Sequence, residues 1–254
     1  MLVIAVLFFA AFVSSPCTIA QADPGNTPPP LELEEVQRIL DNAKANYAKV
    51  HDYTTMMHKE EYRDGEIELD EDTMIKFQKP FKVYLKWTSG DNAGSQLLYV
   101  KGKYDNKMIV RKGGGFLKKV FGTMEMDPYG FWLRKFTKHS IDEVGFGGLI
   151  EKSHEQFRFA LEKGFITAAQ STLTEFDGKP AYKVVFVVSP EAEEDGYYCH
   201  SAIQYFDAET FMPVKSTFWL WEDDAAEIFT YSDIKLNVGL PDVAFDRDNE
   251  EYQF

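Results

Sequence analysis

The sequence has 254 residues, enough for one large domain or two small ones. Hydrophobic residues make up 44% and charged residues 27%, which excludes a chain that is disordered over most of its length. Asp and Glu number 41 against 27 Lys and Arg, and the net charge of −14 argues against a nucleic acid as partner.

Residues 1–22 carry no charged side chain. Their apolar run, residues 2–13, is followed by small residues and by Ala20-Gln21-Ala22. This order is typical of a secretory signal peptide that is cleaved near Ala22, and it predicts a periplasmic or secreted protein. The run is shorter than the ~20 apolar residues of a membrane-crossing helix, and an uncleaved anchor is the alternative. Residues 23–31 are interpreted as a proline-rich spacer and residues 32–254 as a single domain.

Two helices and a long series of strands are expected after the spacer. Apolar side chains recur at helical spacing in residues 32–50, and again in residues 147–163 before Gly164. The tail, residues 240–254, is acidic and is predicted to be largely irregular. The expected strands are 52–63, 66–78, 81–87, 95–101, 107–111, 116–121, 165–175, 179–189, 199–206, 214–221 and 225–235.

Residues 81–87 show the clearest period-two pattern, in which apolar side chains alternate with polar ones. This alternation predicts a strand with one dry and one solvated face. Asp-Gly pairs at 64–65 and 177–178 predict tight hairpin turns. Because no parallel strand–helix–strand rhythm occurs, we expect an α+β fold. Its strongly curved antiparallel sheet, an incomplete β-barrel, would wrap around the N-terminal helix and the central helix.

Residue patterns of known catalytic and metal sites are missing. The five histidines lack metal-ligand spacing, and Gly113-Gly114-Gly115 lacks the Lys-Ser/Thr ending of a phosphate loop. We therefore predict no catalytic, cofactor-binding or metal-binding residue and no enzymatic activity. Two distant carboxylates, as in a glycosidase, are the enzymatic alternative. Cleavage of the leader leaves Cys199 as either a buried small hydrophobe or a reactive thiol.

Aromatic residues are unusually frequent, at 15% of the sequence, and this excess bears on function. Most are expected to fill the core, but a curved sheet can also enclose an apolar cavity that takes acyl chains. The residues predicted to line such a cavity are Phe81, Val83, Leu85, Trp87, Phe131, Trp132, Phe186, Phe218 and Phe229. Phe131 and Trp132 precede Arg134 and are interpreted as a lid or mouth segment with a basic rim.

Residues 77–87 and 97–103 resemble the strand pair of the bacterial outer-membrane lipoprotein carriers, the LolA-like superfamily. Residues 138–151 and 231–246 are similar to one family in it, domain of unknown function 1571. The resemblance implies an incomplete barrel closed by helices, with a cavity for acyl chains and no catalysis. It also implies a lid latch at the basic residue before the proline, here Lys79, with Arg134 as a second candidate. Lysine lacks the planar fork of arginine, so this latch would be weaker.

Two functions follow from these patterns. The first is an exported carrier that holds the acyl chains of a lipid or a lipidated protein, with an envelope membrane protein as a further partner. The alternative is a protein-interaction or sensing module of the cell envelope, built on the same fold without a lipid ligand. Its acidic surface would attract basic partners.

Overall fold

A computed structural model describes residues 31–113, 122–130, 140–222 and 224–254. The signal-peptide segment, most of the spacer and the strand expected over residues 116–121 lie outside these ranges. All elements below belong to the compact unit Leu31–Phe254.

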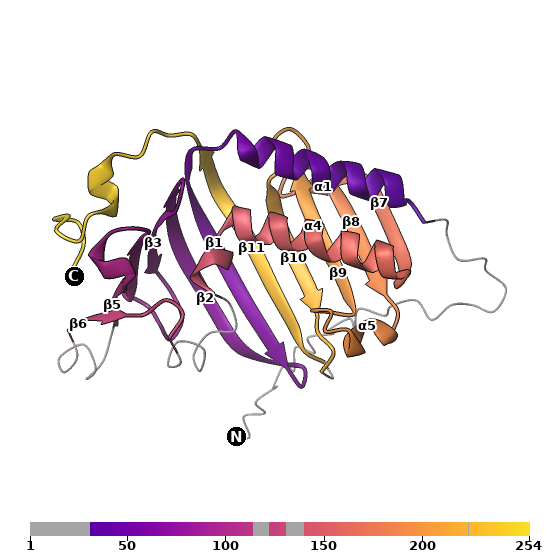
Figure 1. Ribbon diagram of the computed structural model, residues 1–254, viewed down its shortest axis with the longest axis horizontal. Helices are drawn as coiled ribbons and strands as arrows, with labels where there is room; N and C mark the ends of the chain where they lie inside the picture. Colours follow the sequence, from indigo (N-terminus) through magenta and orange to yellow (C-terminus); the bar gives the residue numbers. More distant parts are fainter. Residues whose placement is uncertain (1–30, 114–121, 131–139, 223) are drawn as a thin grey trace, which may run out of the picture. The chain divides into compact units, whose positions relative to one another are not determined.

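Two long helices lie on one side of the sheet (Figure 1). The first, α1, spans Leu33–Ala48 and buries Val36, Ile39 and Leu40. Burying each of these side chains contributes about 1.5–3 kcal/mol, which offsets the entropy lost on ordering the helix. The second, α4, spans Phe146–Lys163. The short helices are α5 (Glu191–Glu194) and the 3-10 turns η1 (Tyr104–Asn106), η2 (Ile141–Glu143) and η3 (Asp242–Phe245).

The strands pair into one antiparallel sheet of 11 strands, in the order β6-β5-β4-β3-β2-β1-β11-β10-β9-β8-β7. Their bounds are β1 Asp52–Arg63, β2 Glu66–Gln78, β3 Lys82–Trp87, β4 Gln96–Val100, β5 Met108–Arg111, β6 Thr123–Met126, β7 Ile166–Phe176, β8 Lys179–Val188, β9 Ser201–Asp207, β10 Pro213–Trp219 and β11 Ala226–Leu236. Within the described ranges β6 and β7 do not pair, so the sheet is an open half-barrel. The expected fold class is therefore confirmed. The short strand β6 was not expected.

The two predicted Asp-Gly turns are present. Asp64 and Gly65 join β1 to β2, and Asp177 and Gly178 join β7 to β8. All four residues have positive φ, between 49° and 75°. A tight hairpin turn of the type that matches strand twist requires this conformation, and Asp-Gly accommodates it with little strain.

Helix α4 begins one residue before the expected start, within the glycine-rich segment 145–148. Gly145, at φ 84°, precedes the first helical residue, Phe146. A Cβ atom at Gly145 would lie 1.9 Å from the Tyr53 hydroxyl oxygen. That hydroxyl accepts a hydrogen bond from the Phe146 amide at 3.1 Å, in a fully buried position. The glycine thus lets the helix start against the sheet.

Two apolar clusters lie on opposite sides of the sheet. The helix-facing cluster contains the buried side chains of α1 and α4 together with one face of the strands. A smaller tail cluster lies on the other side and joins Tyr84, Leu98 and Ile109 to Phe245 and Tyr252. The prediction of a solvated face for residues 81–87 is therefore wrong at its centre, because Tyr84 is 1% exposed beneath the chain's C-terminal tail.

Candidate ligand-binding face

The helix-facing side of the sheet is apolar over most of its width. At its centre Tyr53 lies 5.2 Å from Phe77 and 4.7 Å from Phe146, measured between ring centroids. Strand alternation brings these positions to one side, since Tyr53 of β1 is directly opposite Phe77 of β2. A continuous aromatic surface results between the sheet and α4.

The structure places seven of the nine predicted cavity residues in this helix-facing cluster. Val83, Leu85 and Phe186 are buried in it. The other four are half-buried and pack against its margin; they are Phe81, Trp87, Phe218 and Phe229. Phe131 and Trp132 lie outside the described residues. The period-two pattern thus brings together residues from β3, β8, β10 and β11, and their role as ligand contacts stays a prediction.

The rings of this cluster touch one another. Phe77 and Phe81 have centroids 5.3 Å apart, and Phe157 of α4 lies 5.4 Å from Phe186. Two hollows in the described part of the chain have volumes of about 330 Å³ and 280 Å³. The first is lined by Glu193, Tyr198, Leu220, Trp221, Glu222 and Glu227, and the second lies between α1 and α4. Neither is lined by any of the seven predicted residues.

Polar groups replace apolar ones at one end of the helix-facing side. Glu227 of β11 is 1% exposed and accepts a hydrogen bond from the Tyr198 hydroxyl at 2.5 Å. Burial, reinforced by this carboxylate, raises the pKa of Tyr198 well above its usual range. Glu71 of β2 is also buried and accepts hydrogen bonds from Trp87 Nε1 and Asn92 Nδ2 at 2.8 and 2.9 Å. Sequence reasoning missed both carboxylates, although Glu71 occupies the same strand phase as Phe77 and so had to face the helices.

Lys79 lies at the end of helix α1. Its Nζ donates hydrogen bonds to the carbonyl oxygens of Tyr47 and Ala48 at 2.6 and 3.2 Å, and lies 4.3 Å from the Tyr47 ring centroid. Both carbonyls lie at the C-terminal end of α1, and that of Tyr47 also accepts from the Val50 amide at 3.0 Å. The ammonium adds a charged donor to both and interacts favourably with the helix dipole. Burial lowers the pKa of Lys79. Arg134 lies outside the described residues, and a latch between the lid and Lys79 stays a prediction.

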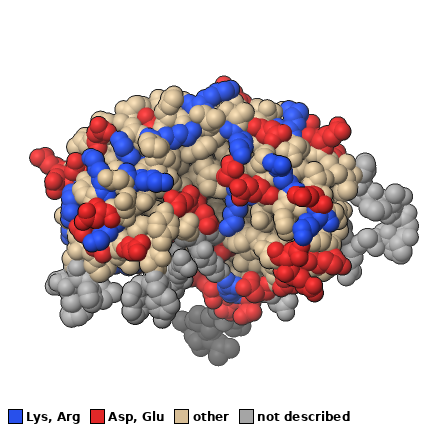
Figure 2. Space-filling view, in the orientation of Figure 1, with Lys and Arg blue, Asp and Glu red and all other residues tan. Residues whose placement is uncertain are grey.

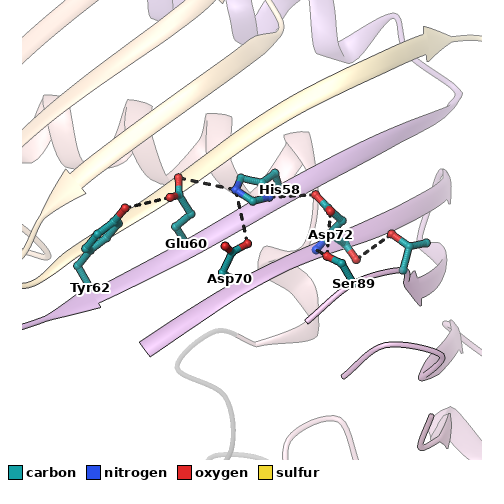
Figure 3. A network of polar contacts seen from close by, with 7 residues as sticks. His58, Glu60, Tyr62, Asp70, Asp72 and Ser89 are labelled. Atoms are coloured by element: carbon teal, nitrogen blue, oxygen red, sulfur yellow. Dashed lines mark hydrogen bonds and ion pairs between the residues drawn. The ribbon is translucent and has the colours of Figure 1, made fainter. Parts of the chain in front are cut away.

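The opposite side of the sheet carries a polar network on β1 and β2 (Figure 3). His58 Nδ1 lies 2.9 Å from Asp72 Oδ1, and His58 Nε2 lies 3.8 Å from carboxylate oxygens of Glu60 and Asp70. The Ser89 hydroxyl donates to Asp72 Oδ2 at 2.8 Å. The network joins neighbouring strands, and among the described residues no group of three His, Cys, Asp or Glu side chains is arranged to hold a metal ion.

Cys199 is buried, 5% exposed, at the end of the loop that leads into β9. Burial raises the pKa of its thiol to about 12. Because the thiolate is the reactive form, a thiol with this pKa is inert at neutral pH. Of the two alternatives from the sequence, the structure favours the buried small hydrophobe.

The sequence matches the family described as "Protein of unknown function (DUF1571)" over residues 50–254. The chain belongs to this family. The match covers the entire sheet, including the segments on which the resemblance rested, and that expectation is confirmed. A search of the curated proteins finds no match.

Several solved structures are similar to this family member. Lipoprotein LppX of Mycobacterium tuberculosis is 12% identical, with 84% of this chain and 99% of that chain covered and a TM-score of 0.48. LprF of Mycobacterium bovis is 13% identical, covering 82% and 96%, with a TM-score of 0.45. A LolA superfamily protein of Nitrosomonas europaea is 13% identical, covering 84% and 98%, with a TM-score of 0.37. None of the helices in the described ranges combines the length and apolar character needed to cross a membrane.

Proposed function

We propose that this protein is exported and holds the acyl chains of a lipid or a lipidated protein on the helix-facing side of its sheet, without catalysing a reaction. The observation that carries the proposal is the convergence of apolar side chains from β3, β8, β10 and β11 on one side of an open sheet. An open half-barrel covered by helices offers an apolar interior to which a chain gains access when the covering elements separate.

The margin of the helix-facing cluster is the place where such a chain would enter. Four of its aromatic side chains are only half-buried there, namely Phe81, Trp87, Phe218 and Phe229. Moving them therefore loses less packing energy than moving the fully buried Val83. Each acyl methylene transferred from water contributes about 0.8 kcal/mol, which can offset the packing energy that is given up when the rings separate. The leader-like segment, residues 1–22, supports export.

The acidic surface favours the second candidate, an envelope module that binds a basic protein partner. Carboxylates gather over α5, whereas basic and acidic side chains are interspersed over much of the remaining visible face (Figure 2). Such a concentration speeds association with a basic partner and is weakened by salt. This function needs only the outer surface of the sheet and helices, and the helices need not move away from the sheet.

Native mass spectrometry of the full-length protein, exported to a bacterial periplasm and purified without detergent, separates the two candidates. We expect a mass increment that organic extraction identifies as a lipid or an acylated peptide. Phe81→Ala should lower the loaded fraction. Phe176→Ala is the matched control, because Phe176 packs on Tyr205 on the other side of the sheet. An empty protein that retains a basic protein partner would replace the carrier with the interaction module.

A further inference from the structure

Strand β7 is an edge of the sheet that the molecule protects only in part. It pairs with β8 alone, and the two-residue turn after Phe176 directs the backbone groups of even-numbered residues toward β8. Odd-numbered residues therefore direct their N–H and C=O groups away from the sheet. Two of these groups are satisfied by Glu32: its amide donates to the Ala169 carbonyl at 2.8 Å, and its carboxylate accepts from the Ser171 amide at 2.7 Å.

The second half of this edge has no partner among the described residues. The outward groups are the carbonyl of Ser171 and both backbone groups of Leu173 and of Glu175, and no described residue bonds to them. Leu173 is 62% exposed, and its neighbours Thr172 and Thr174 are exposed as well.

The protections usual for an edge strand are missing here. Natural edges carry lysine, proline or inward-pointing charges that prevent pairing with another chain. In β7 the only charged residue is Glu175, and the strand contains neither lysine nor proline. An unprotected run of β-branched and apolar residues is a template for strand addition.

We propose that two copies of this chain pair through β7, antiparallel, across a two-fold axis at Leu173. Leu173 then lies opposite Leu173 of the second copy, and each amide donates to the other's carbonyl. In the same register Thr172 is opposite Thr174, and Ser171 is opposite Glu175, whose amide reaches the open Ser171 carbonyl. Threonine pairs are favourable cross-strand neighbours, and the only charged residue of the strand, Glu175, is opposite the uncharged Ser171. The Glu32 carboxylate on the Ser171 amide is the like charge nearest to Glu175.

This self-complementary register is the reason for choosing a second copy over an unrelated peptide. The Ser171 amide is already bonded to the Glu32 carboxylate, so the pair of Ser171 and Glu175 keeps only one of its two backbone hydrogen bonds, from the Glu175 amide to the Ser171 carbonyl, until Glu32 releases that amide. Each copy carries a net charge of −14, so electrostatic repulsion between the copies weakens the dimer at low ionic strength. Added salt screens this repulsion, and we expect dimerisation to strengthen with salt.

Sedimentation over a protein concentration series tests the proposal. The full chain should show a monomer–dimer equilibrium that shifts at least about tenfold toward dimer between low and 0.3 M salt, a change of about 1.4 kcal/mol. Leu173→Pro removes an amide that β8 does not use, and a proline with its nitrogen facing solvent is tolerated on an edge. We expect this variant to be monomeric.

Oxidative cross-linking keeps the test independent of proline effects on folding. At about 5.5 Å between opposed Cα atoms, Leu173→Cys is within the range for a disulfide across the axis. Leu161→Cys, an exposed position on α4, is the matched control, and the buried Cys199 is common to both. A wild-type protein that stays monomeric, or equal cross-linking of the two variants, would overturn the proposal. A monomer that retains a peptide lost in Leu173→Pro would assign the edge to a different partner.

Discussion

Lys79 shows how one side chain joins a strand end to a helix end. The residue follows β2 in sequence, yet its ammonium satisfies carbonyls of α1 some 30 residues earlier. Hydrogen bonds from a charged donor are worth more than neutral ones. We therefore expect Lys79 to stabilise the C-terminal end of α1.

Replacing Lys79 with methionine keeps most of the side-chain volume and removes the cap. We expect the free energy of unfolding to fall by about 1–2 kcal/mol, because the Ala48 carbonyl loses its donor and the Tyr47 carbonyl keeps only the Val50 amide. Urea unfolding measures this change. Lys86→Met, at an exposed position on β3, is the matched control and should change stability by less than about 0.5 kcal/mol. Equal stability of the two variants would contradict the capping role.

Asp72 is the residue whose protonation the His58 network controls. Its pKa is lowered, first by the hydrogen bond from Ser89 and then by that with His58. A carboxyl whose folded pKa is depressed stabilises the fold above its ordinary pKa, and that contribution is lost as pH falls through the folded value. Because the Asp72 side chain is 43% exposed, the contribution is small.

Ser89→Ala should raise the pKa of Asp72 toward its usual value. The carboxyl carbon shift of Asp72, followed by NMR between pH 2 and pH 6, reports this directly. Thr88→Ala is the control, because the Thr88 hydroxyl donates to the backbone carbonyl of Asp72 and not to its carboxylate. An Asp72 titration that is the same in Ser89→Ala and wild type would show that Ser89 does not stabilise the ionised form.

At the scale of elements, the packing of the tail against the sheet was not predicted from the sequence. Residues 240–254 contain five Asp and Glu residues and show no strand or helix period, so the sequence predicted only an acidic, largely irregular tail. The structure uses Phe245 and Tyr252 to cover β3 and β4. Tyr252 stacks on Tyr84 with 3.8 Å between centroids, and its hydroxyl donates to the Ala244 carbonyl at 2.7 Å.

Tyr252→Ala tests whether the tail is a structural element. Removing this 8% exposed ring leaves Tyr84 uncovered and should lower the free energy of unfolding by about 3 kcal/mol. Tyr252→Phe keeps the stacked ring and loses the hydrogen bond, at a cost of about 1 kcal/mol. Urea unfolding gives both values, and amide exchange in β3 and β4 should accelerate only in the alanine variant. Identical stabilities of the two variants would contradict the packing role.

Local chemistry made much of the sheet predictable. The Asp-Gly turns define where β1 meets β2 and where β7 meets β8, and the observed bounds differ from the expected ones by no more than one residue. Strand β6 was missed because Thr123–Met126 is too short to show a period. The partner of Lys79 was missed for another reason: helix and strand ends far apart in sequence meet only through the fold. The alternation of side chains along β2 and β3 would have placed Glu71 and Trp87 on the same side of the sheet.

At the scale of the whole molecule, the two sides of the sheet differ in what covers them. The helix-facing side gathers the apolar residues that the sequence predicted for a ligand, and buried carboxylates border it at one end. The other side is closed by the tail over β3 and β4 and crossed by the His58 network on β1 and β2. A protein that binds an apolar chain on one side of its sheet should lose affinity through mutations on that side alone.

The affinity of the exported protein for a fluorescent C16 fatty acid, compared between Phe218→Ala and Trp219→Ala, tests this most directly. The two residues are neighbours on β10, and Phe218 packs in the helix-facing cluster while Trp219 points to the other side. We predict that Phe218→Ala weakens binding about tenfold, as expected when about 1.4 kcal/mol of apolar burial is removed, and that Trp219→Ala leaves it unchanged. Equal effects of the two substitutions, or no binding by the wild-type protein, would contradict the account.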